Sequence, residues 1–113
     1  MHEMTIVAGI LEIAVNEARS AGARAINAVE IEVGRLAGVE IDALEFCFEA
    51  ARKDTMAAGA DLVIHDIPGR GWCPECDREV DVDFFMAVCP ECAKAMVDIR
   101  QGRELRVRAI NVD

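Results

Sequence analysis

Four of the five cysteines form two CxxC motifs, Cys73 to Cys76 and Cys89 to Cys92, with twelve residues between them. Each motif can turn back on itself so that its two sulfurs face one point, and a short hairpin between the motifs brings the two pairs together. Four thiolates arranged in this way form a tetrahedral cage that suits Zn²⁺. Such a cage leaves no open coordination position, so we predict a structural zinc site and not a reactive centre.

Three other uses of these cysteines are compatible with the spacing: two disulfides, a redox-active CxxC pair, and a rubredoxin-like iron site. No signal peptide is evident, and a reducing cytosol disfavours disulfides. The position after the second cysteine of such a motif often holds glycine, because the turn needs a positive φ. Here Asp77 and Ala93 hold these two places. Alanine tolerates positive φ poorly, so we expect the second motif to be shaped differently from the first.

A second chemical signal lies at the N-terminus, which begins Met1, His2, Glu3. A terminal amine, the following imidazole and deprotonated backbone amides place several nitrogens at the spacing that a square-planar ion prefers, which favours Ni²⁺ or Cu²⁺ over Zn²⁺. A solvated terminal histidine that binds no metal is the alternative. We interpret His65 as a hydrogen-bonded strand residue and Cys47 as a buried, inert thiol.

The charge balance limits the class of partner. The chain of 113 residues has a formal net charge of -9, from 12 Lys and Arg against 21 Asp and Glu. Zinc ribbons commonly serve nucleic-acid machinery, where a basic face must meet the phosphates. Residues 69–101 instead contain four basic and seven acidic residues, and aromatic residues make up only 4% of the chain. We therefore expect no nucleic-acid partner.

Length and hydropathy suggest one small domain that carries an even smaller metal-stabilised segment. Hydrophobic residues make up 53% of the chain, but charged residues interrupt them everywhere. Because no apolar run is long enough to span a bilayer, we expect no membrane association and a cytoplasmic location.

The hydrophobic pattern predicts an α+β fold. Apolar residues recur every three or four positions, as in a helix, or alternate, as in a strand. The predicted helices are 4–18 and 40–58, and the predicted strands are 25–33, 62–67, 80–88, 96–99 and 105–112. Gly22, Gly34 and Gly59 stand where the first helix, the first strand and the second helix are expected to end.

The strands around Val29, Val63 and Val107 predict one three-stranded sheet with both helices on one face, because lone short strands bury too little surface. The metal-binding segment is then an insertion between the last two strands of this sheet. We expect it to form a small β zinc-ribbon lobe in which 96–99 returns beside 80–88. The predicted lobes are 1–68 with 102–113, and 69–101.

Four features follow one another along the chain: the Met1-His2-Glu3 start, the stretch from Gly34 to Glu40 before a helix, the paired CxxC motifs, and Gly102 to Leu105 at the start of the last strand. In their order and spacing, these features resemble the HypA/HybF family of hydrogenase nickel-incorporation proteins. The resemblance covers essentially the whole chain.

This resemblance implies a nickel metallochaperone, not an enzyme, which carries Ni(II) on the lobe of 1–68 and 102–113 and holds a structural Zn(II) in the lobe of 69–101. It implies that nickel is bound by atoms of Met1, His2, Glu3 and Glu40. It leaves open which atom is the fourth donor. The implied partners are the nickel GTPase of the hydrogenase maturation pathway and the hydrogenase large-subunit precursor. In members that serve urease, they include urease accessory proteins.

Two functions from other classes stay open at this point. A zinc-ribbon adaptor that binds nucleic acid or a protein complex is the main alternative, and the net acidity disfavours it. A small redox protein that uses one CxxC pair is the other. The sequence has no evident Ser/His/Asp or Cys/His nucleophile arrangement and no phosphate-binding loop, so we expect no enzyme.

Overall fold

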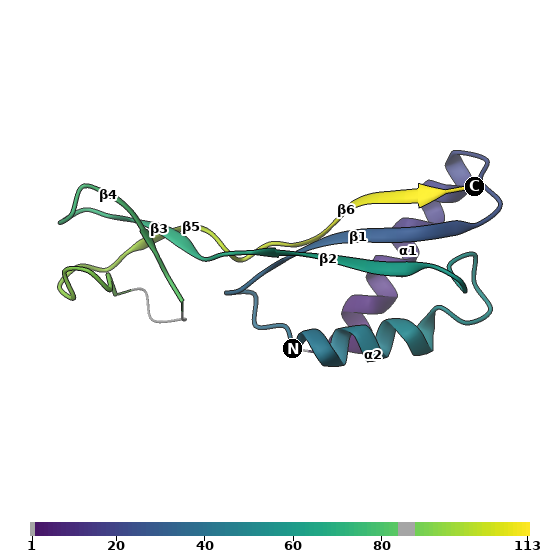
Figure 1. Cartoon of the computed structure of the whole chain (residues 1–113), viewed down its shortest axis with the longest axis horizontal. Helices are drawn as coiled ribbons and strands as arrows, with labels where there is room; N and C mark the ends of the chain where they lie inside the picture. The colour runs from purple at the N-terminus through teal and green to yellow at the C-terminus, as the bar shows by residue number, and fades with distance from the viewer. Residues whose placement is uncertain (1, 84–87) are drawn as a thin grey trace. The chain divides into compact units, whose positions relative to one another are not determined.

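The computed structural model describes residues 2–83 and 88–113. The chain divides into two compact units (Figure 1). The first comprises Met1–Glu32, Val39–His65 and Arg106–Asp113, and the second comprises Val33–Gly38 and Asp66–Leu105. The predicted assignment of nickel to one lobe and zinc to the other stays a prediction.

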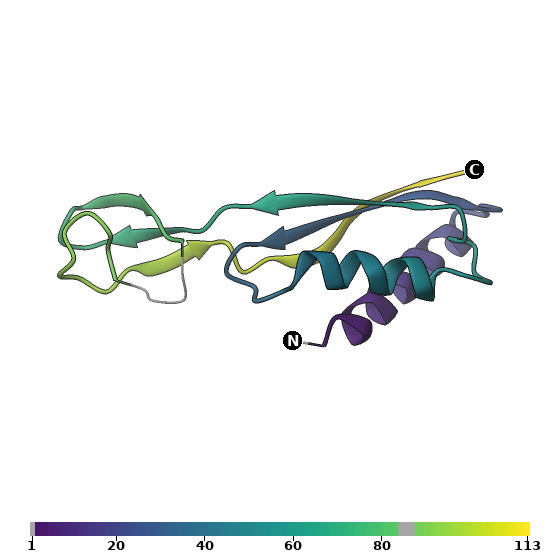
Figure 2. The ribbon, with the colours of Figure 1, turned by 60° about the horizontal axis from the view of Figure 1, so that its bottom comes forward.

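The first sheet has the strand order β2 (Asp61–Ile67), β1 (Ile26–Gly34), β6 (Leu105–Val112). Helices α1 (Glu3–Ser20) and α2 (Ile41–Ala51) lie on the same side of it, as Figure 2 shows. β1 and β2 run in the same direction and are joined through α2, as parallel neighbours require. β6 runs the opposite way (Figure 1). The predicted α+β fold, with two helices on a three-stranded sheet, is confirmed.

The hydrophobic core of the first unit comes from the periodic positions of its helices and its central strand. The buried side chains on these elements include Val7, Ile10, Leu11, Ala14 and Ala18 of α1, Leu44 and Phe48 of α2, and Ile26, Val29 and Ile31 of β1. Each large side chain in this set contributes about 1.5–3 kcal/mol when it leaves water. Neither α1 nor α2 combines the length and hydrophobicity that a bilayer-spanning helix needs.

The second helix is shorter than predicted. The prediction of 40–58 is wrong at its C-terminal end, because α2 stops at Ala51. The hydroxyl of Thr55 donates to the carbonyl of Arg52 at 2.6 Å and accepts from the N–H of Ala57 at 3.0 Å. Asp54 has a φ of 62°. Side-chain bonds of this kind give the backbone an alternative to the helix, so apolar periodicity alone overestimated its length.

The second unit contains a sheet with the strand order β4 (Arg78–Asp81), β3 (Arg70–Cys73), β5 (Asp98–Gln101). β4 and β5 both pair antiparallel with β3. The expectation that 96–99 returns beside 80–88 is wrong for the sheet, since β3 lies between the two segments. Among the described residues of the two segments, an isolated antiparallel bridge joins Val88 to Met96. Residues 84–87 of the predicted strand lie outside the described residues.

The central strand β3 was missed because it has four residues, including Gly71 and the first cysteine of a CxxC motif. A Cβ on Gly71 would lie 2.2 Å from a side-chain carbon of Val97. Glycine is therefore needed at this point for close packing rather than for a turn. Periodicity cannot reveal a strand of this length and composition.

Two backbone segments approach each other closely within the second unit. The N–H of Gly34 donates to the carbonyl of Glu104 at 2.7 Å, and the N–H of Leu36 donates to the carbonyl of Gly102 at 2.7 Å. A Cβ on Gly34 would lie 1.9 Å from the Gly102 oxygen. Gly102 itself has a φ of 117°, which side chains rarely tolerate. Both glycines are therefore required by the local backbone geometry.

We predict that Gly34→Ala destabilises the protein by about 2 kcal/mol, because the added methyl group forces the two segments apart. The measurement is urea unfolding followed by circular dichroism. Gly9→Ala is the matched control, since a Cβ at Gly9 in α1 would meet nothing within 4 Å. Alanine in a helix interior should leave stability unchanged or raise it by up to about 1 kcal/mol. Equal stability of the two variants would contradict the close approach.

Candidate metal centre

The four cysteines of the two CxxC motifs meet at one point of the second unit. The Sγ atoms of Cys73, Cys76, Cys89 and Cys92 all lie within 4.8 Å of one another. The Cys73 and Cys92 sulfurs are 3.7 Å apart, and those of Cys76 and Cys89 are 3.9 Å apart. Cys73 and Cys89 are buried, whereas the other two are partly exposed. The structure thus brings together all four cysteines that the sequence singled out.

These distances fit a tetrahedral metal ion. With metal–sulfur bonds of about 2.3 Å, the edge of a regular tetrahedron is about 3.8 Å. The observed separations of 3.7 and 3.9 Å lie on either side of this value. All five cysteines are free thiols, and a disulfide would need sulfurs about 2.05 Å apart. The cluster can therefore hold a metal such as zinc, and its four sulfurs fill a tetrahedral coordination shell.

The surrounding backbone favours the thiolate form at one corner of the cluster. The N–H groups of Lys94 and Ala95 hydrogen-bond the Cys92 sulfur and lower the pKa of this thiol to about 6. The neighbouring sulfur of Cys73, together with burial, raises the pKa of Cys76 to about 12. A metal ion must displace the remaining thiol protons when it binds, so metal binding competes with protons. Sequence reasoning missed the two backbone donors, which no residue type reveals.

The two CxxC motifs have the same backbone shape. Asp77 has a φ of 54° and Ala93 a φ of 56°. The N–H of Asp77 donates to the carbonyl of Cys73 at 2.8 Å, and the N–H of Ala93 donates to that of Cys89 at 2.8 Å. The expectation that alanine would reshape the second motif is therefore wrong. The turn that brings Cys89 and Cys92 together requires a left-handed residue after the second cysteine. Ala93 adopts this conformation in spite of its Cβ.

The cysteines are also the core of the second unit. Its buried cluster consists of Cys73 and Cys89 with four aliphatic side chains, Leu36, Val80, Val82 and Val97. Cys76, Cys92, Ala95 and Ile99 pack against this cluster. The described part of this core gives little hydrophobic stabilisation, so a bound ion would contribute directly to folding.

The predicted N-terminal site is only partly described, because Met1 lies outside the described residues. His2 is exposed and forms the N-cap of α1, where its carbonyl accepts from the N–H of Thr5 at 3.1 Å. The carboxylate of Glu3 accepts a hydrogen bond of 3.3 Å from the backbone N–H of Glu40, the N-cap of α2. The starts of the two helices therefore lie side by side.

The Glu3 carboxyl is held in its charged form. Hydrogen bonds from its own backbone N–H and from that of Glu40 lower its pKa below the usual value. The carboxylate therefore stays ionised at neutral pH, and its contacts persist there. Sequence reasoning assigned only a backbone nitrogen to Glu3, since a contact across 37 positions leaves no trace in local periodicity.

The other two candidate residues, His65 and Cys47, belong to neither predicted ligand set. His65 contacts the carboxylate of Glu30 through Nε2 at 2.8 Å, which agrees with the expected hydrogen-bonded strand histidine. Cys47 is partly exposed on α2 and does not belong to the cysteine cluster. The expectation that Cys47 is buried is therefore wrong, because its side chain is partly exposed.

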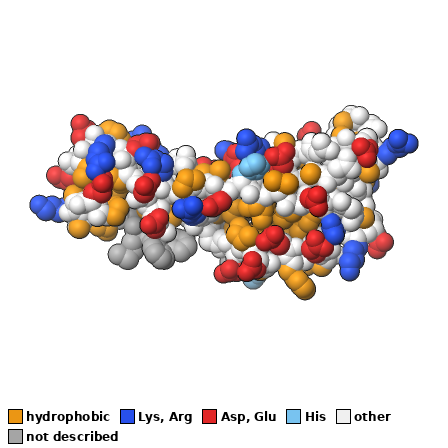
Figure 3. All heavy atoms as spheres, in the orientation of Figure 1, with side chains coloured by type: hydrophobic (Ala, Val, Ile, Leu, Met, Phe, Trp, Pro, Cys, Tyr) orange, Lys and Arg blue, Asp and Glu red, His pale blue; other side chains and the backbone are white. Residues whose placement is uncertain are grey.

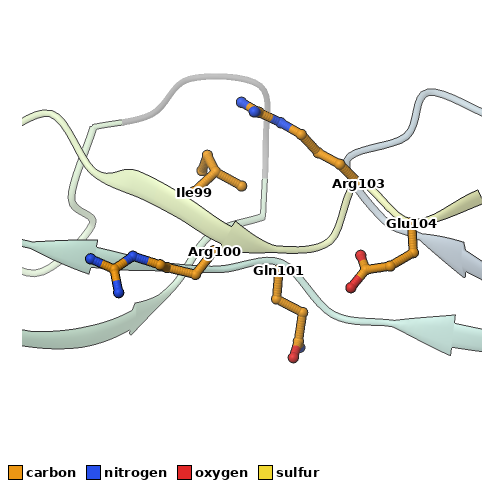
Figure 4. A pocket seen from close by; sticks show the side chains of 5 residues that line it. All are labelled: Ile99, Arg100, Gln101, Arg103 and Glu104. Atoms are coloured by element: carbon orange, nitrogen blue, oxygen red, sulfur yellow. The ribbon is translucent and has the colours of Figure 1, made fainter.

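A pocket of about 280 Å³ lies near the end of β5 in the second unit. Its lining residues are Ile99, Arg100, Gln101, Arg103 and Glu104 (Figure 4). Gln101 donates to the carbonyl of Pro68 at 3.0 Å, and Glu104 accepts from the N–H of Gly102 at 2.7 Å. Arg100 pairs with Asp98. Because three of the four polar side chains that line it already have partners, we assign no ligand to this pocket.

Comparison with known proteins agrees with the geometry. A family model described as "Hydrogenase/urease nickel incorporation, metallochaperone, hypA" matches residues 1–112. The chain belongs to the HypA family. The hydrogenase maturation factor HypA of Chlorobaculum tepidum is 45% identical over 113 residues, which cover all of both chains. That of Geobacter metallireducens is 44% identical with the same coverage.

Solved structures of HypA proteins have the same fold. The solution structure of the Ni metallochaperone HypA from Helicobacter pylori superposes with a TM-score of 0.69 at 24% identity and covers 99% of this chain and 97% of its own. A second solution structure of a HypA protein gives a TM-score of 0.72, also at 24% identity, over 99% and 96% of the two chains. The predicted family and fold are thus confirmed. HypA proteins are metallochaperones rather than enzymes, which also agrees with the prediction.

We predict that Ala93→Gly stabilises the metal-loaded protein by about 1 kcal/mol, because glycine adopts a positive φ without the strain of a Cβ. Chemical unfolding at a fixed metal content measures this gain. Asp77→Gly is the control at the equivalent turn, and it should gain less since aspartate tolerates this conformation better than alanine. A loss of stability in Ala93→Gly would contradict the shape described for the second motif.

Proposed function

We propose that this HypA-family chain binds Ni(II) at its N-terminus and delivers it during maturation of nickel-iron hydrogenase. The ligands are the terminal amine of Met1, the imidazole and backbone nitrogen of His2, and the backbone nitrogen of Glu3, with Glu40 beside them. The observation that carries this proposal is the contact of 3.3 Å between the Glu3 carboxylate and the Glu40 N–H. It holds residue 40 close to the N-terminal residues that the family resemblance implies as ligands.

The position of His2 and Glu3 suits binding through backbone nitrogens. N–H groups in the first turn of a helix have no acceptor within the helix. These amides can therefore lose their protons to a metal ion without breaking the hydrogen-bond ladder of α1. Imidazole and amine nitrogens must also be unprotonated, so nickel affinity falls as the pH falls. An exposed terminal site of this kind can both accept and release its ion.

We further propose that the four clustered cysteines hold a structural Zn²⁺. Four thiolates at tetrahedral spacing match the preference of zinc, and they leave no position for a water ligand. The ion supplies coordination energy for folding of the second unit and takes no part in chemistry. Iron in the same cage is the alternative that metal analysis distinguishes.

The proposed partners follow from the same function. They are the nickel GTPase of the hydrogenase maturation pathway and the hydrogenase large-subunit precursor, which receives the ion. Service to urease through its accessory proteins is a second proposed use, supported by the urease in the family description. We place this exchange in the cytoplasm.

We expect the untagged, zinc-loaded chain to bind about one Ni²⁺, and His2→Ala to bind none in the same concentration range, because the imidazole and its chelate ring are lost. Calorimetry with absorption spectroscopy measures both. His65→Ala is the control, since His65 contacts Glu30 and lies outside the proposed ligand set. If His2→Ala binds nickel like the wild type, the N-terminal site is wrong.

We expect the purified chain to contain about one zinc ion, and Cys76→Ser to lose it together with the β structure of the second unit. Elemental analysis and backbone amide exchange measure the two effects. Cys47→Ser, which leaves the cluster intact, should retain both the ion and the structure. Retention of zinc at wild-type affinity by Cys76→Ser would contradict the four-cysteine site, and iron in place of zinc would refute the assigned ion.

A further inference from the structure

An ion pair joins the two CxxC motifs of the second unit. The guanidinium of Arg78 contacts the carboxylate of Glu91 through Nη2 and Oε2. Arg78 lies two residues after Cys76 of the first motif, and Glu91 lies one residue before Cys92 of the second. Arg78 also lies opposite Cys73 in the antiparallel pairing of β4 with β3. The ion pair therefore ties the second motif to the strand pair that carries the first.

The two motifs have the same local sequence, yet only one of two equivalent ion pairs is formed between them. Each motif reads Cys-Pro-Glu-Cys and has a basic residue two positions later, so Arg78 corresponds to Lys94 and Glu91 corresponds to Glu75. Within residues 2–83 and 88–113, neither Lys94 nor Glu75 takes part in an ion pair. Lys94 is therefore a matched comparison for Arg78: the local sequence is the same, and the cross-motif contact is not.

The guanidinium lies beside one edge of the cysteine cluster. This edge joins the sulfurs of Cys76 and Cys89, which are 3.9 Å apart and come from different motifs. Glu91 raises the pKa of Arg78 most, through its hydrogen bond and its charge, and the sulfurs of Cys76 and Cys89 raise it further through their charge. The positive charge of Arg78 therefore acts on a sulfur of each motif.

Backbone N–H groups serve the other two sulfurs of the cluster. The N–H of Cys76 donates to the Cys73 sulfur at 3.4 Å. The N–H groups of Lys94 and Ala95 hydrogen-bond the Cys92 sulfur. These contacts favour the charged thiolate over the neutral thiol. The guanidinium supplies the same kind of stabilisation at the edge of the cluster that these N–H groups do not serve.

The cluster needs this positive charge because its ligands carry an excess of negative charge. Four thiolates outnumber the two positive charges of a divalent ion, so the loaded cluster is an anion. Residues 69–101 contain seven acidic against four basic residues. Figure 3 shows acidic and basic side chains interspersed over the visible surface of the second unit. A cation that lies beside the sulfurs lowers the free energy of this anion.

We propose that Arg78 is a positioning residue of the cysteine cluster, which holds the second CxxC motif against β4 through Glu91 and offsets the thiolate charge at the edge of Cys76 and Cys89. The inference rests on the proposed structural Zn²⁺ and adds a residue outside the ligand set that strengthens its hold on the ion. The side chains of Arg78 and Glu91 are 58% and 44% exposed, so solvent screens their charges. We therefore expect an effect of about tenfold in metal affinity, the lower end for residues that support metal ligands.

The test is competition for zinc between the full chain and a chelator of known affinity. Arg78→Gln should hold Zn²⁺ about tenfold more weakly than the wild type, and Arg78→Lys should recover most of this loss because it keeps the charge. Lys94→Gln, the matched control, should bind like the wild type. Glu91→Gln should weaken binding less than Arg78→Gln does, because the charge of Arg78 stays beside the sulfurs.

Cobalt in place of zinc measures the charge at the sulfurs directly. Removing a cation from beside a thiolate raises the energy of its electrons. The sulfur-to-cobalt charge-transfer band should therefore move to lower energy in Arg78→Gln and keep its position in Lys94→Gln. At saturating metal, both variants should give the circular dichroism spectrum of the wild type, so that a shifted band reports charge and not loss of folding.

Equal zinc affinity of Arg78→Gln and wild type would overturn the role of Arg78 and leave the zinc site standing. Equal weakening by Lys94→Gln would show a general effect of net charge and also overturn it. An unshifted cobalt band in Arg78→Gln, or no recovery in Arg78→Lys, would refute the contribution of charge. If the wild type binds no Zn²⁺ at the cluster, the proposed zinc site fails and this inference falls with it.

Discussion

The convergence of four sulfurs on one point is the constraint on which the second unit depends. Among the described residues, its buried cluster contains four aliphatic side chains besides Cys73 and Cys89, and their burial offsets only part of the conformational entropy of the segments that surround them. An ion held by four thiolates would add coordination energy to this hydrophobic stabilisation. Ala93 adopts a left-handed conformation that its side chain disfavours, in the turn that brings Cys89 and Cys92 together.

The two proposed metal sites have different roles: the cysteine cluster would retain its ion, and the N-terminal site would exchange its ion. The cysteine cluster would surround an ion on all sides, and the N–H donors that lower the pKa of Cys92 favour the thiolate form that binds a metal. The N-terminal site has an exposed imidazole and backbone nitrogens on the first turn of α1. Copper should bind such nitrogens more tightly than nickel does, so nickel selectivity requires metal availability and docking of the right partner. A carrier needs this second kind of site, because a closed cage would not release its cargo.

The sequence predicted those features that local pattern encodes. The CxxC spacing identified the four ligands, and apolar periodicity identified both helices of the first unit and all three strands of its sheet. It did not give the end of α2, which side-chain bonds of Thr55 decide, or β3, which is too short for a pattern. Nor could it give the contact between Glu3 and Glu40, because that contact depends on how α1 and α2 pack.

The contact between Glu3 and Glu40 bears on how the proposed nickel site changes when the ion arrives. Before nickel binds, the Glu3 carboxylate accepts from its own backbone N–H as well as from that of Glu40. The proton of the Glu3 N–H must leave if the Glu3 amide nitrogen becomes a ligand, whereas the Glu40 N–H keeps its proton. The carboxylate therefore loses one partner but keeps the one that links the helices. Nickel binding would then release a proton while α1 and α2 stay in register, so the ion joins a preorganised site and meets little ordering cost.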